Sequence, residues 1–319
     1  MVDTKILPQI GINSVYIIKT EGIPLIVRNY AETSIFTKDY VIISGFITAF
    51  NMFTESAMGA YISDLSLLGQ RLFFKHQSEI VYIIAIDEQA FVNLSLQDCR
   101  HFIEELLWRM VSIFSDFFGE AEKKYKFRAL EKELDAFSER VDELIVEGAQ
   151  SWLETLSLMR KVNTAIVADL ESLKVSHNLL QNSGLLNLFV LEENNLTYET
   201  NLAGEESTEE MNQTITNFYK TIQSFASNAL VSAVNDIGLF SQRIHIGKFE
   251  RRTIMVIVDQ LRYLHYPITI LNLIIEDLLI KLNKHLDGNS PLETFPSKVE
   301  RMFYTSIEEI GFILSVSPF

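Results

Sequence analysis

The sequence predicts an α+β protein in which two similar units each hold a five-stranded antiparallel sheet flanked by helices. The first observation behind this prediction is the length of 319 residues, which is enough for two domains. The second is an internal similarity at a constant shift of 172 residues. The third is the apolar pattern, in which segments of strand type and segments with the three-to-four-residue spacing of helices follow in the same order twice.

The duplication involves polar residues as well as the apolar pattern. In the window from Asp64 to Asp87 the shift preserves five identities, where about one is expected by chance. These are Asp64/Asp236, Leu67/Leu239, Gln70/Gln242, Arg71/Arg243 and Asp87/Asp259. The same register continues upstream, from residue 43 to residue 57, and downstream, from residue 103 to residue 107. A chance coincidence of two amphipathic segments does not explain a register that persists over several elements, so we interpret the similarity as a duplication.

Each copy begins with two strands joined by a turn. Residues 15–19 and 23–30 flank the sequence Thr20-Glu21-Gly22, in which glycine supplies the positive φ that a tight turn requires. The corresponding strands of the second copy are residues 188–191 and 196–200.

A helix follows these strands in each copy. In the first, apolar residues at positions 43, 46, 50, 53 and 57 step by three and four and predict one buried face. The helix of the second copy starts with a predicted capping box. In it, the side chain of Ser207 accepts a hydrogen bond from the backbone amide of Glu210, and the side chain of Glu210 accepts one from the backbone amide of Ser207. The acidic run at residues 205–210 is thereby explained as favourable charge at a helix N-terminus.

Three strands come next, at residues 61–68, 71–76 and 80–86. The last is a continuous apolar run, which is typical of a central strand covered by other elements. Its counterpart is residues 254–258.

Two helices close each copy. A capping box at residues 95–98 begins the first of them, and Pro267 lies at the aligned position of the second copy. Further helical pattern covers residues 125–147 and 297–310. Because Gly148 interrupts the helical pattern, we predict a first domain at 14–147, a helical linker at 148–183 whose helix spans 151–181, and a second domain at 184–319.

This order of elements, with the apolar patterns Gly69–Phe74 and Ile80–Asp87, resembles longin domains and the related roadblock domains. The chain is most similar to two-copy archaeal proteins of that superfamily, and the resemblance covers residues 14–118 and 186–286. A roadblock domain has an extra helix before its first strand, and only the second copy has a segment for it, at 151–181. The resemblance therefore implies two longin-like domains joined by a long helical linker, with a roadblock assignment left open for the second.

The resemblance also implies a function. Longin and roadblock domains pair with one another and form surfaces for small Ras-like GTPases or for partners in vesicle trafficking. We therefore expect a non-catalytic interaction platform whose partner is a small Ras-like GTPase or another longin or roadblock protein, with intramolecular pairing or a homodimer as further arrangements. Two alternatives stay open: a sensory module that binds a small ligand, and a structural subunit of a larger cytosolic complex.

Charge and composition exclude several classes of function. Forty-two acidic residues against 27 basic ones give a formal net charge of -15, which disfavours nucleic acid and anionic lipid. No apolar stretch reaches the roughly 20 residues of a membrane-spanning helix. The single cysteine, Cys99, fits a reducing compartment. We expect a cytoplasmic protein that meets membranes only through a partner, although the local basic segment 248–252 could act as a docking contact.

Signatures of catalysis are missing from the sequence. It contains no P-loop, no G-x-G-x-x-G, no H-E-x-x-H and no nucleophile elbow. His101 precedes Glu104 and Glu105 at a spacing that could bind a metal ion, but an ion pair is the more common outcome. Cys99 aligns with Leu271, which indicates a small core residue. We expect no enzymatic activity, no cofactor and no metal.

Candidate partner-binding residues come from two features. One is the set of polar residues shared by both copies, for which the alternative is that each arginine pairs with a strand-end aspartate. The other is the apolar edge strand of the first hairpin, because an unpaired edge favours addition of a partner strand. The candidates are Gln70, Arg71, Gln242, Arg243, Ile23, Leu25 and Val27.

Overall fold

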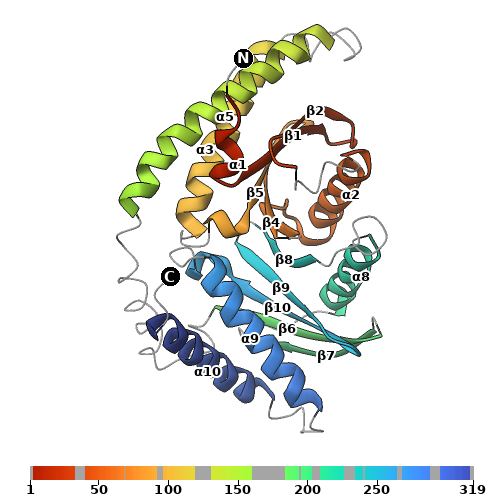
Figure 1. Cartoon of the computed structure of the whole chain (residues 1–319). Coiled ribbons are helices and arrows are strands. Elements are labelled where there is room, and N and C mark those ends of the chain that lie inside the picture. The colour runs from red at the N-terminus through yellow and green to blue at the C-terminus, as the bar shows by residue number, and fades with distance from the viewer. Residues whose placement is uncertain are drawn as a thin grey trace. The chain divides into compact units, whose positions relative to one another are not determined.

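In the computed structural model, both halves of the chain contain strands and helices in the order that the sequence predicts (Figure 1). The structure describes residues 3–32, 40–67, 69–91, 96–118, 131–159, 184–193, 195–202, 209–225, 234–239, 241–263, 268–287 and 295–316. The expected capping residues Ser95, Ser207 and Pro267 lie outside these ranges, as does most of the predicted linker helix at 151–181.

The first unit is built from a short helix, five strands and three longer helices within the described residues. In chain order these are α1 (Ile6–Gln9), β1 (Ile12–Lys19), β2 (Pro24–Asn29), α2 (Tyr40–Met58), β3 (Asp64–Leu67), β4 (Gln70–Gln77), β5 (Ile80–Asp87), the 3₁₀ turn η2 (Glu88–Phe91), α3 (Leu96–Phe118) and α5 (Glu131–Met159).

The second unit repeats this order from β6 onward. Its elements are β6 (Leu185–Glu192), β7 (Asn195–Asn201), α8 (Glu209–Phe225), β8 (Val234–Gly238), β9 (Gln242–Lys248), β10 (Arg252–Asp259), the 3₁₀ turn η5 (Gln260–Tyr263), α9 (Ile268–Asp287) and α10 (Phe295–Val316). A shift of 172 residues converts the bounds of β5 into those of β10 and the bounds of η2 into those of η5. The structure thus keeps the register found in the sequence.

The strands form one ten-stranded sheet in the order β2-β1-β5-β4-β3-β8-β9-β10-β6-β7. The prediction of two separate five-stranded longin-like sheets is therefore wrong, whereas the α+β class and the antiparallel pairing are correct. The reason is physical: strands join through backbone N–H and C=O groups, which every residue but proline carries. The pattern of side chains consequently predicts where strands lie, but it does not predict whether the outermost strand of a five-stranded sheet pairs with a further strand.

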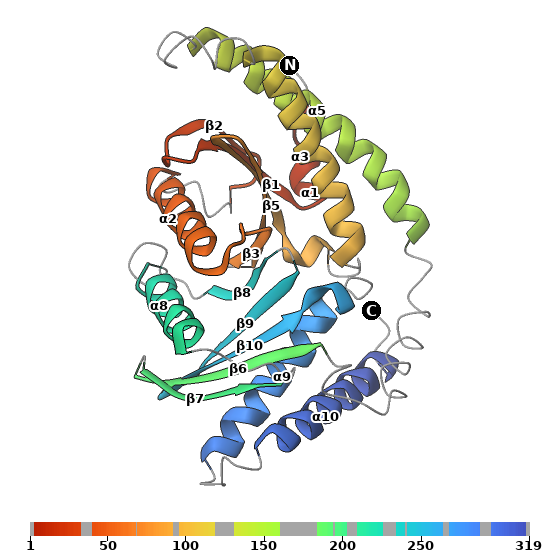
Figure 2. The ribbon, with the colours of Figure 1, turned by 180° about the vertical axis from the view of Figure 1, so that it is seen from behind.

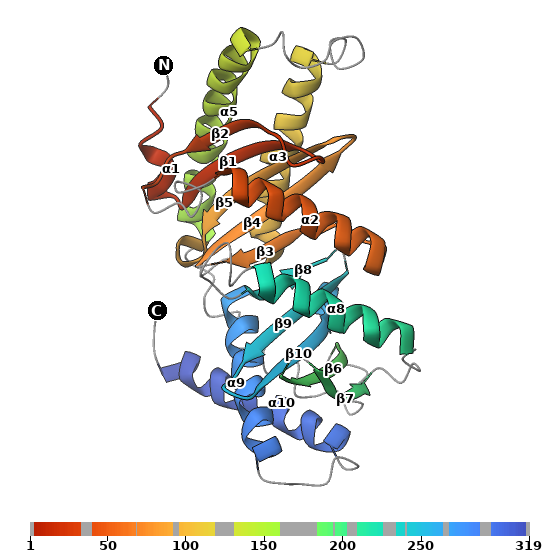
Figure 3. The same cartoon turned by 90° about the vertical axis from the view of Figure 1, so that its right-hand side faces the viewer.

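Helices cover both faces of each unit's strands. In the first unit α2 lies on one face and α3 and α5 lie on the other (Figures 1 and 3). In the second unit α8 lies on one face and α9 and α10 lie on the other (Figure 2). This arrangement explains why β5 and β10 are almost entirely buried, since both faces of these strands contact helices.

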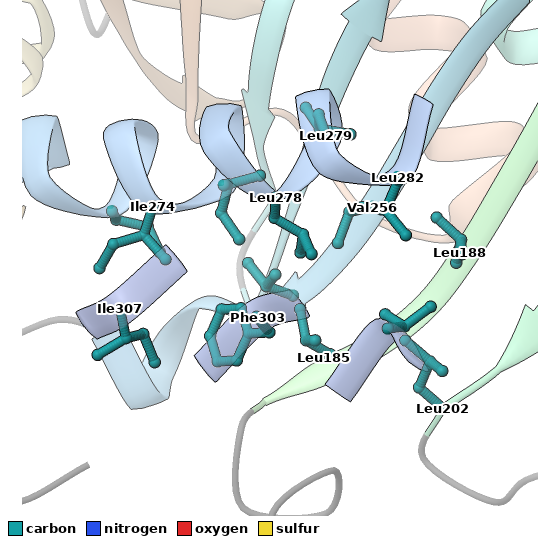
Figure 4. Close-up of a cluster of buried hydrophobic side chains, with 14 of the residues drawn as sticks. Leu185, Leu188, Leu202, Val256, Ile274, Leu278, Leu279, Leu282, Phe303 and Ile307 are labelled. Atoms are coloured by element: carbon teal, nitrogen blue, oxygen red, sulfur yellow. The ribbon is translucent and has the colours of Figure 1, made fainter. Parts of the chain in front are cut away.

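The core of the second unit joins both of its outer helices to the sheet. Leu278 of α9 and Phe303 of α10 are at most 1 % exposed and pack with Val256 of β10 (Figure 4). Leu185 and Leu188 of β6 complete the same cluster. Burial of such apolar side chains contributes roughly 1.5–3 kcal/mol each and fixes α9 and α10 against the strands.

The helix α5 does not break at Gly148 but continues to Met159. A Cβ atom at Gly148 would lie 2.3 Å from Cδ2 of Leu106, so glycine is needed here for the close approach of α5 to α3. Helix α5 belongs up to Met159 to the first compact unit, and the strands and helices that follow, from β6 to α10, form the second.

Candidate functional site

Arg71, a predicted partner contact, is buried in the first unit. Its side chain is 1 % exposed, and it donates a hydrogen bond of 2.6 Å to Asp64. The second terminal nitrogen of Arg71 lies 2.8 Å from a carboxylate oxygen of Glu88. Arg100 of α3 also contacts Asp64, at 3.1 Å. The guanidinium group therefore connects β3, β4 and η2 and does not face a partner in this conformation.

Arg243 repeats the arrangement in the second unit. It has no exposed side-chain surface, it donates to Asp236, and it lies 3.4 Å from the side-chain oxygen of Gln260, the residue aligned with Glu88. This pairing of each arginine with a strand-end aspartate is the alternative that the sequence left open. Direct contact of Arg71 or Arg243 with a partner stays a prediction, and it would require these groups to leave the interior.

The remaining shared polar residues also lie at strand ends. Gln70 is buried and Gln242 is half-buried, and the two begin β4 and β9 opposite Asp87 and Asp259. Asp87 accepts a hydrogen bond of 2.9 Å from the backbone of Gln89, and Asp259 accepts one of 3.0 Å from the backbone of Leu261. Each aspartate thus caps the 3₁₀ turn that follows its strand.

The apolar candidates Ile23, Leu25 and Val27 lie on and before the edge strand β2. Ile23 is 52 % exposed, while Leu25 and Val27 are half-buried. Strand β2 pairs with β1, and within the described residues it has no strand on its other side. An edge of this kind presents backbone donors and acceptors to a further strand.

The outward face of α2 is a feature that the sequence analysis missed. Val41 is 58 % exposed and Met52 is 63 % exposed. The two residues lie on one side of the helix, because 11 positions are close to three turns of 3.6 residues each. Gly45 lies between them with nothing within 4 Å of an added Cβ. The helix contains a single charged residue, Glu55, and this lack of charge is the signal that identifies the face from the sequence.

The turn before β2 is held against α2. The hydroxyl of Ser44 donates a hydrogen bond of 2.8 Å to the carbonyl of Gly22, whose positive φ of 87° suits glycine. Ile23 follows directly, so this exposed residue lies close to the first turns of α2. We name the set of Ile23, Leu25, Val27, Val41, Gly45 and Met52 on these two elements the α2–β2 surface.

The corresponding face of α8 in the second unit is polar. The residues aligned with Val41, Gly45 and Met52 are Gln213, Asn217 and Ser224, and all three are exposed. The two units therefore share their fold but differ in the character of this helix face.

A cavity of about 270 Å³ lies between α3 and α5 of the first unit. Its lining residues are Asp98, His101, Phe102, Glu105, Leu106, Arg109, Gly148, Ser151 and Trp152. The ring of Trp152 stacks on Phe102 with centroids 4.4 Å apart. The indole N–H of Trp152 is buried and has no hydrogen-bond acceptor among the described residues.

Charged side chains line the mouth of this cavity. Arg109 forms an ion pair with Glu105 one turn earlier, and both are about half exposed. His101, the residue considered for a metal site, is exposed on the same wall. Among the described residues no three His, Cys, Asp or Glu side chains come together in a group suited to a metal ion.

Comparison with models of known protein families and with curated proteins finds no match for this chain. Within the described parts of the chain, every helix is too short or too polar to cross a membrane.

Proposed function

We propose that the protein is a non-catalytic interaction platform that binds a small Ras-like GTPase, as the resemblance to longin and roadblock domains implies. The observation that carries the proposal is the α2–β2 surface, where Val41 and Met52 expose more than half of their side chains. Large apolar side chains that gather on an exposed face commonly mark a site of protein–protein interaction.

Charge supports the same assignment. The whole chain has a formal net charge of -15, yet α2 carries only Glu55 among its 19 residues. A partner that covers this helix face removes apolar side chains from water and leaves few charges to desolvate. Gly45 adds to this, because the absence of a side chain allows a partner to approach the helix backbone closely.

The test is capture of partners by the full-length protein from a lysate of its own cells, with GDP or a non-hydrolysable GTP analogue added, read by mass spectrometry. We expect a Ras-like GTPase whose recovery depends on the nucleotide. The variant Val41→Gln/Met52→Ser, which gives α2 the residues of α8, should lose at least about tenfold of that recovery, since buried apolar anchors dominate interface energy.

The matched control is Gln213→Ala/Ser224→Ala at the aligned positions of α8, which should recover the GTPase as well as the native protein does. Recovery of no GTPase with either nucleotide contradicts the proposal. Equal loss in the two variants contradicts the assignment to the α2–β2 surface.

The cavity between α3 and α5 favours a second candidate function, the sensory binding of a small ligand. It combines two aromatic rings, Phe102 and Trp152, with the ionic groups of Arg109 and Glu105. Ligand sites typically have this composition, in which apolar walls carry a few convergent polar groups. A small carboxylate would pair with the exposed guanidinium of Arg109.

Native mass spectrometry of the full-length protein purified from its own cells tests this candidate. We expect a bound small molecule in the native protein and its loss from Arg109→Gln, which removes the guanidinium but leaves the stacked rings of Phe102 and Trp152. Trp108→Phe on the exposed side of α3 is the control and should retain the ligand. Absence of bound mass from the native protein contradicts this second function.

A further inference from the structure

The second unit contains a groove lined by cationic side chains. It has a volume of about 610 Å³ and lies between α9 and α10. Its lining residues are Lys281, Lys284, His285, Lys298, Arg301, Met302 and Thr305. Five of these seven are basic residue types, in a chain whose formal net charge is -15.

The geometry of the two helices brings these side chains together. Lys281 of α9 donates to Glu309 at 2.8 Å and to Ser306 at 3.3 Å on α10. The residues that line the groove recur at spacings of three and four on each helix, which places them on one face of each. The core residues Leu278 and Phe303 fix the helices beneath, so the groove is part of a packed structure (Figure 4).

Nearby carboxylates already form ion pairs, two of them with Lys281 of the groove itself. Asp277 and Glu309 bind Lys281, and Asp287 binds Arg252 at 2.7 Å. Within the described side chains, Lys284, Lys298 and Arg301 form no ion pair. Burial and the positive charge of Lys298 both lower the pKa of His285, so the positive charge of the groove at neutral pH comes from its lysine and arginine side chains.

We propose that this groove binds a ligand carrying clustered phosphate groups, either as the headgroup of a lipid or as a free molecule. Lys284, Lys298 and Arg301 supply donors from two helices, and phosphate oxygens accept several charge-assisted hydrogen bonds at once. The volume suits a small molecule. The acidic remainder of the chain repels anions elsewhere and restricts them to this groove. This site is independent of the α2–β2 surface.

The experiment measures binding of the full-length protein to inositol hexakisphosphate by calorimetry at low ionic strength. A second arm measures flotation with phosphatidylcholine vesicles, with and without phosphatidylinositol bisphosphate. Binding of inositol hexakisphosphate without flotation identifies a soluble ligand. Flotation only with vesicles that contain phosphatidylinositol bisphosphate identifies a lipid headgroup. Both outcomes support the site, and absence of binding in both arms overturns it.

Two double variants locate the binding. Lys298→Gln/Arg301→Gln should weaken affinity by about tenfold or more, because each charged hydrogen bond to phosphate contributes strongly. Lys248→Gln/Arg251→Gln removes the same charge at the exposed β9–β10 hairpin of the same unit and should change affinity by less than about twofold. Equal losses in the two variants would mean diffuse attraction of anions and would overturn the proposal. Unchanged circular dichroism shows that each variant remains folded.

Discussion

Arg71 donates a hydrogen bond of 2.6 Å to Asp64 in the interior of the first unit, where neither side chain exposes more than 1 % of its surface. Arg243 and Asp236 repeat this buried pair in the second unit. The arginine and the aspartate that both copies share thus connect neighbouring strands in each copy. Their recurrence is explained by the fold that both copies share, without any requirement for a partner.

Replacing either arginine is expected to destabilise the protein. Arg71→Met and Arg243→Met each leave a buried carboxylate without its main cation, which typically costs about 3–5 kcal/mol of unfolding free energy. The cost should be larger for Arg243, because Asp64 keeps Arg100 at 3.1 Å whereas the amide of Asn272 lies 3.4 Å from Asp236. Urea unfolding followed by circular dichroism measures both values.

Arg140→Ala is the control for this measurement. Arg140 forms an ion pair with Glu143 on the surface of α5, and exposed pairs of this kind contribute less than about 1 kcal/mol. If Arg71→Met and Arg243→Met unfold at the same urea concentration as Arg140→Ala, the buried pairs do not stabilise the fold.

The sequence predicts the elements of this fold well because periodicity depends on local burial. The continuous apolar run at residues 80–86 becomes β5, and the spacing from residue 43 to 57 becomes α2. The sequence pattern does not predict the single ten-stranded sheet, since backbone groups form the ladder. It misleads at Gly148, where the glycine provides space for Leu106 and does not end a helix.

The candidate sites are less predictable than the fold. Because both copies share an arginine at the same position, the sequence suggests Arg71 and Arg243 as partner contacts, but the structure places both in the interior. In the sequence, the exposed face of α2 is detectable only as a lack of charged residues. The cavity beside Trp152 and the groove beside Arg301 each form where two helices meet, which the sequence pattern does not show. Helix-to-helix contacts are tertiary, so a one-dimensional pattern carries little information about them.

Gly148 of α5 and Gly45 of α2 should respond to substitution with opposite signs. Gly148→Val forces a side chain into Leu106 and should cost about 1–3 kcal/mol through overpacking. Gly45→Ala on α2 adds a methyl group to open space and should stabilise by about 0.5–1 kcal/mol. Thermal unfolding of both variants measures the difference. A stabilised Gly148→Val would show that α3 and α5 do not pack as closely as the structure describes.

Stability should fall below neutral pH partly because of His76. Burial lowers the pKa of His76 to about 4, with a smaller contribution from the charge of Lys75, against the opposing effects of a hydrogen bond with the backbone of Ile62 and of the charge of Glu55. Its unfolded pKa is about 6.5, so between these values the unfolded state binds the proton more tightly. The stabilisation is present above pH 6.5 and is lost as pH falls toward 4. From pH 7 to pH 5 this residue should remove about 1–2 kcal/mol.

His76→Phe isolates the contribution of this residue. The ring of His76 stacks on Tyr61 with centroids 4.5 Å apart, and phenylalanine keeps a ring there without a titrating group. Urea unfolding at pH 7 and pH 5 should show a smaller decrease for the variant than for the native protein. Parallel decreases in the two proteins would show that His76 titrates normally in the folded state.

Cys99 should be unreactive toward thiol reagents until the first unit opens. It is the single cysteine of the chain, it is 4 % exposed, and burial raises the pKa of its thiol to about 12. Because the thiolate is the reactive form, labelling at neutral pH should be about a thousandfold slower or more than in denaturant. Gly148→Val should accelerate labelling because it weakens the packing of α3 against α5, and Arg71→Met because it lowers the free energy of unfolding. Gly45→Ala should not accelerate it. Labelling of the native protein at the rate of the denatured chain would place Cys99 at the surface and contradict the packing of α3 against the sheet.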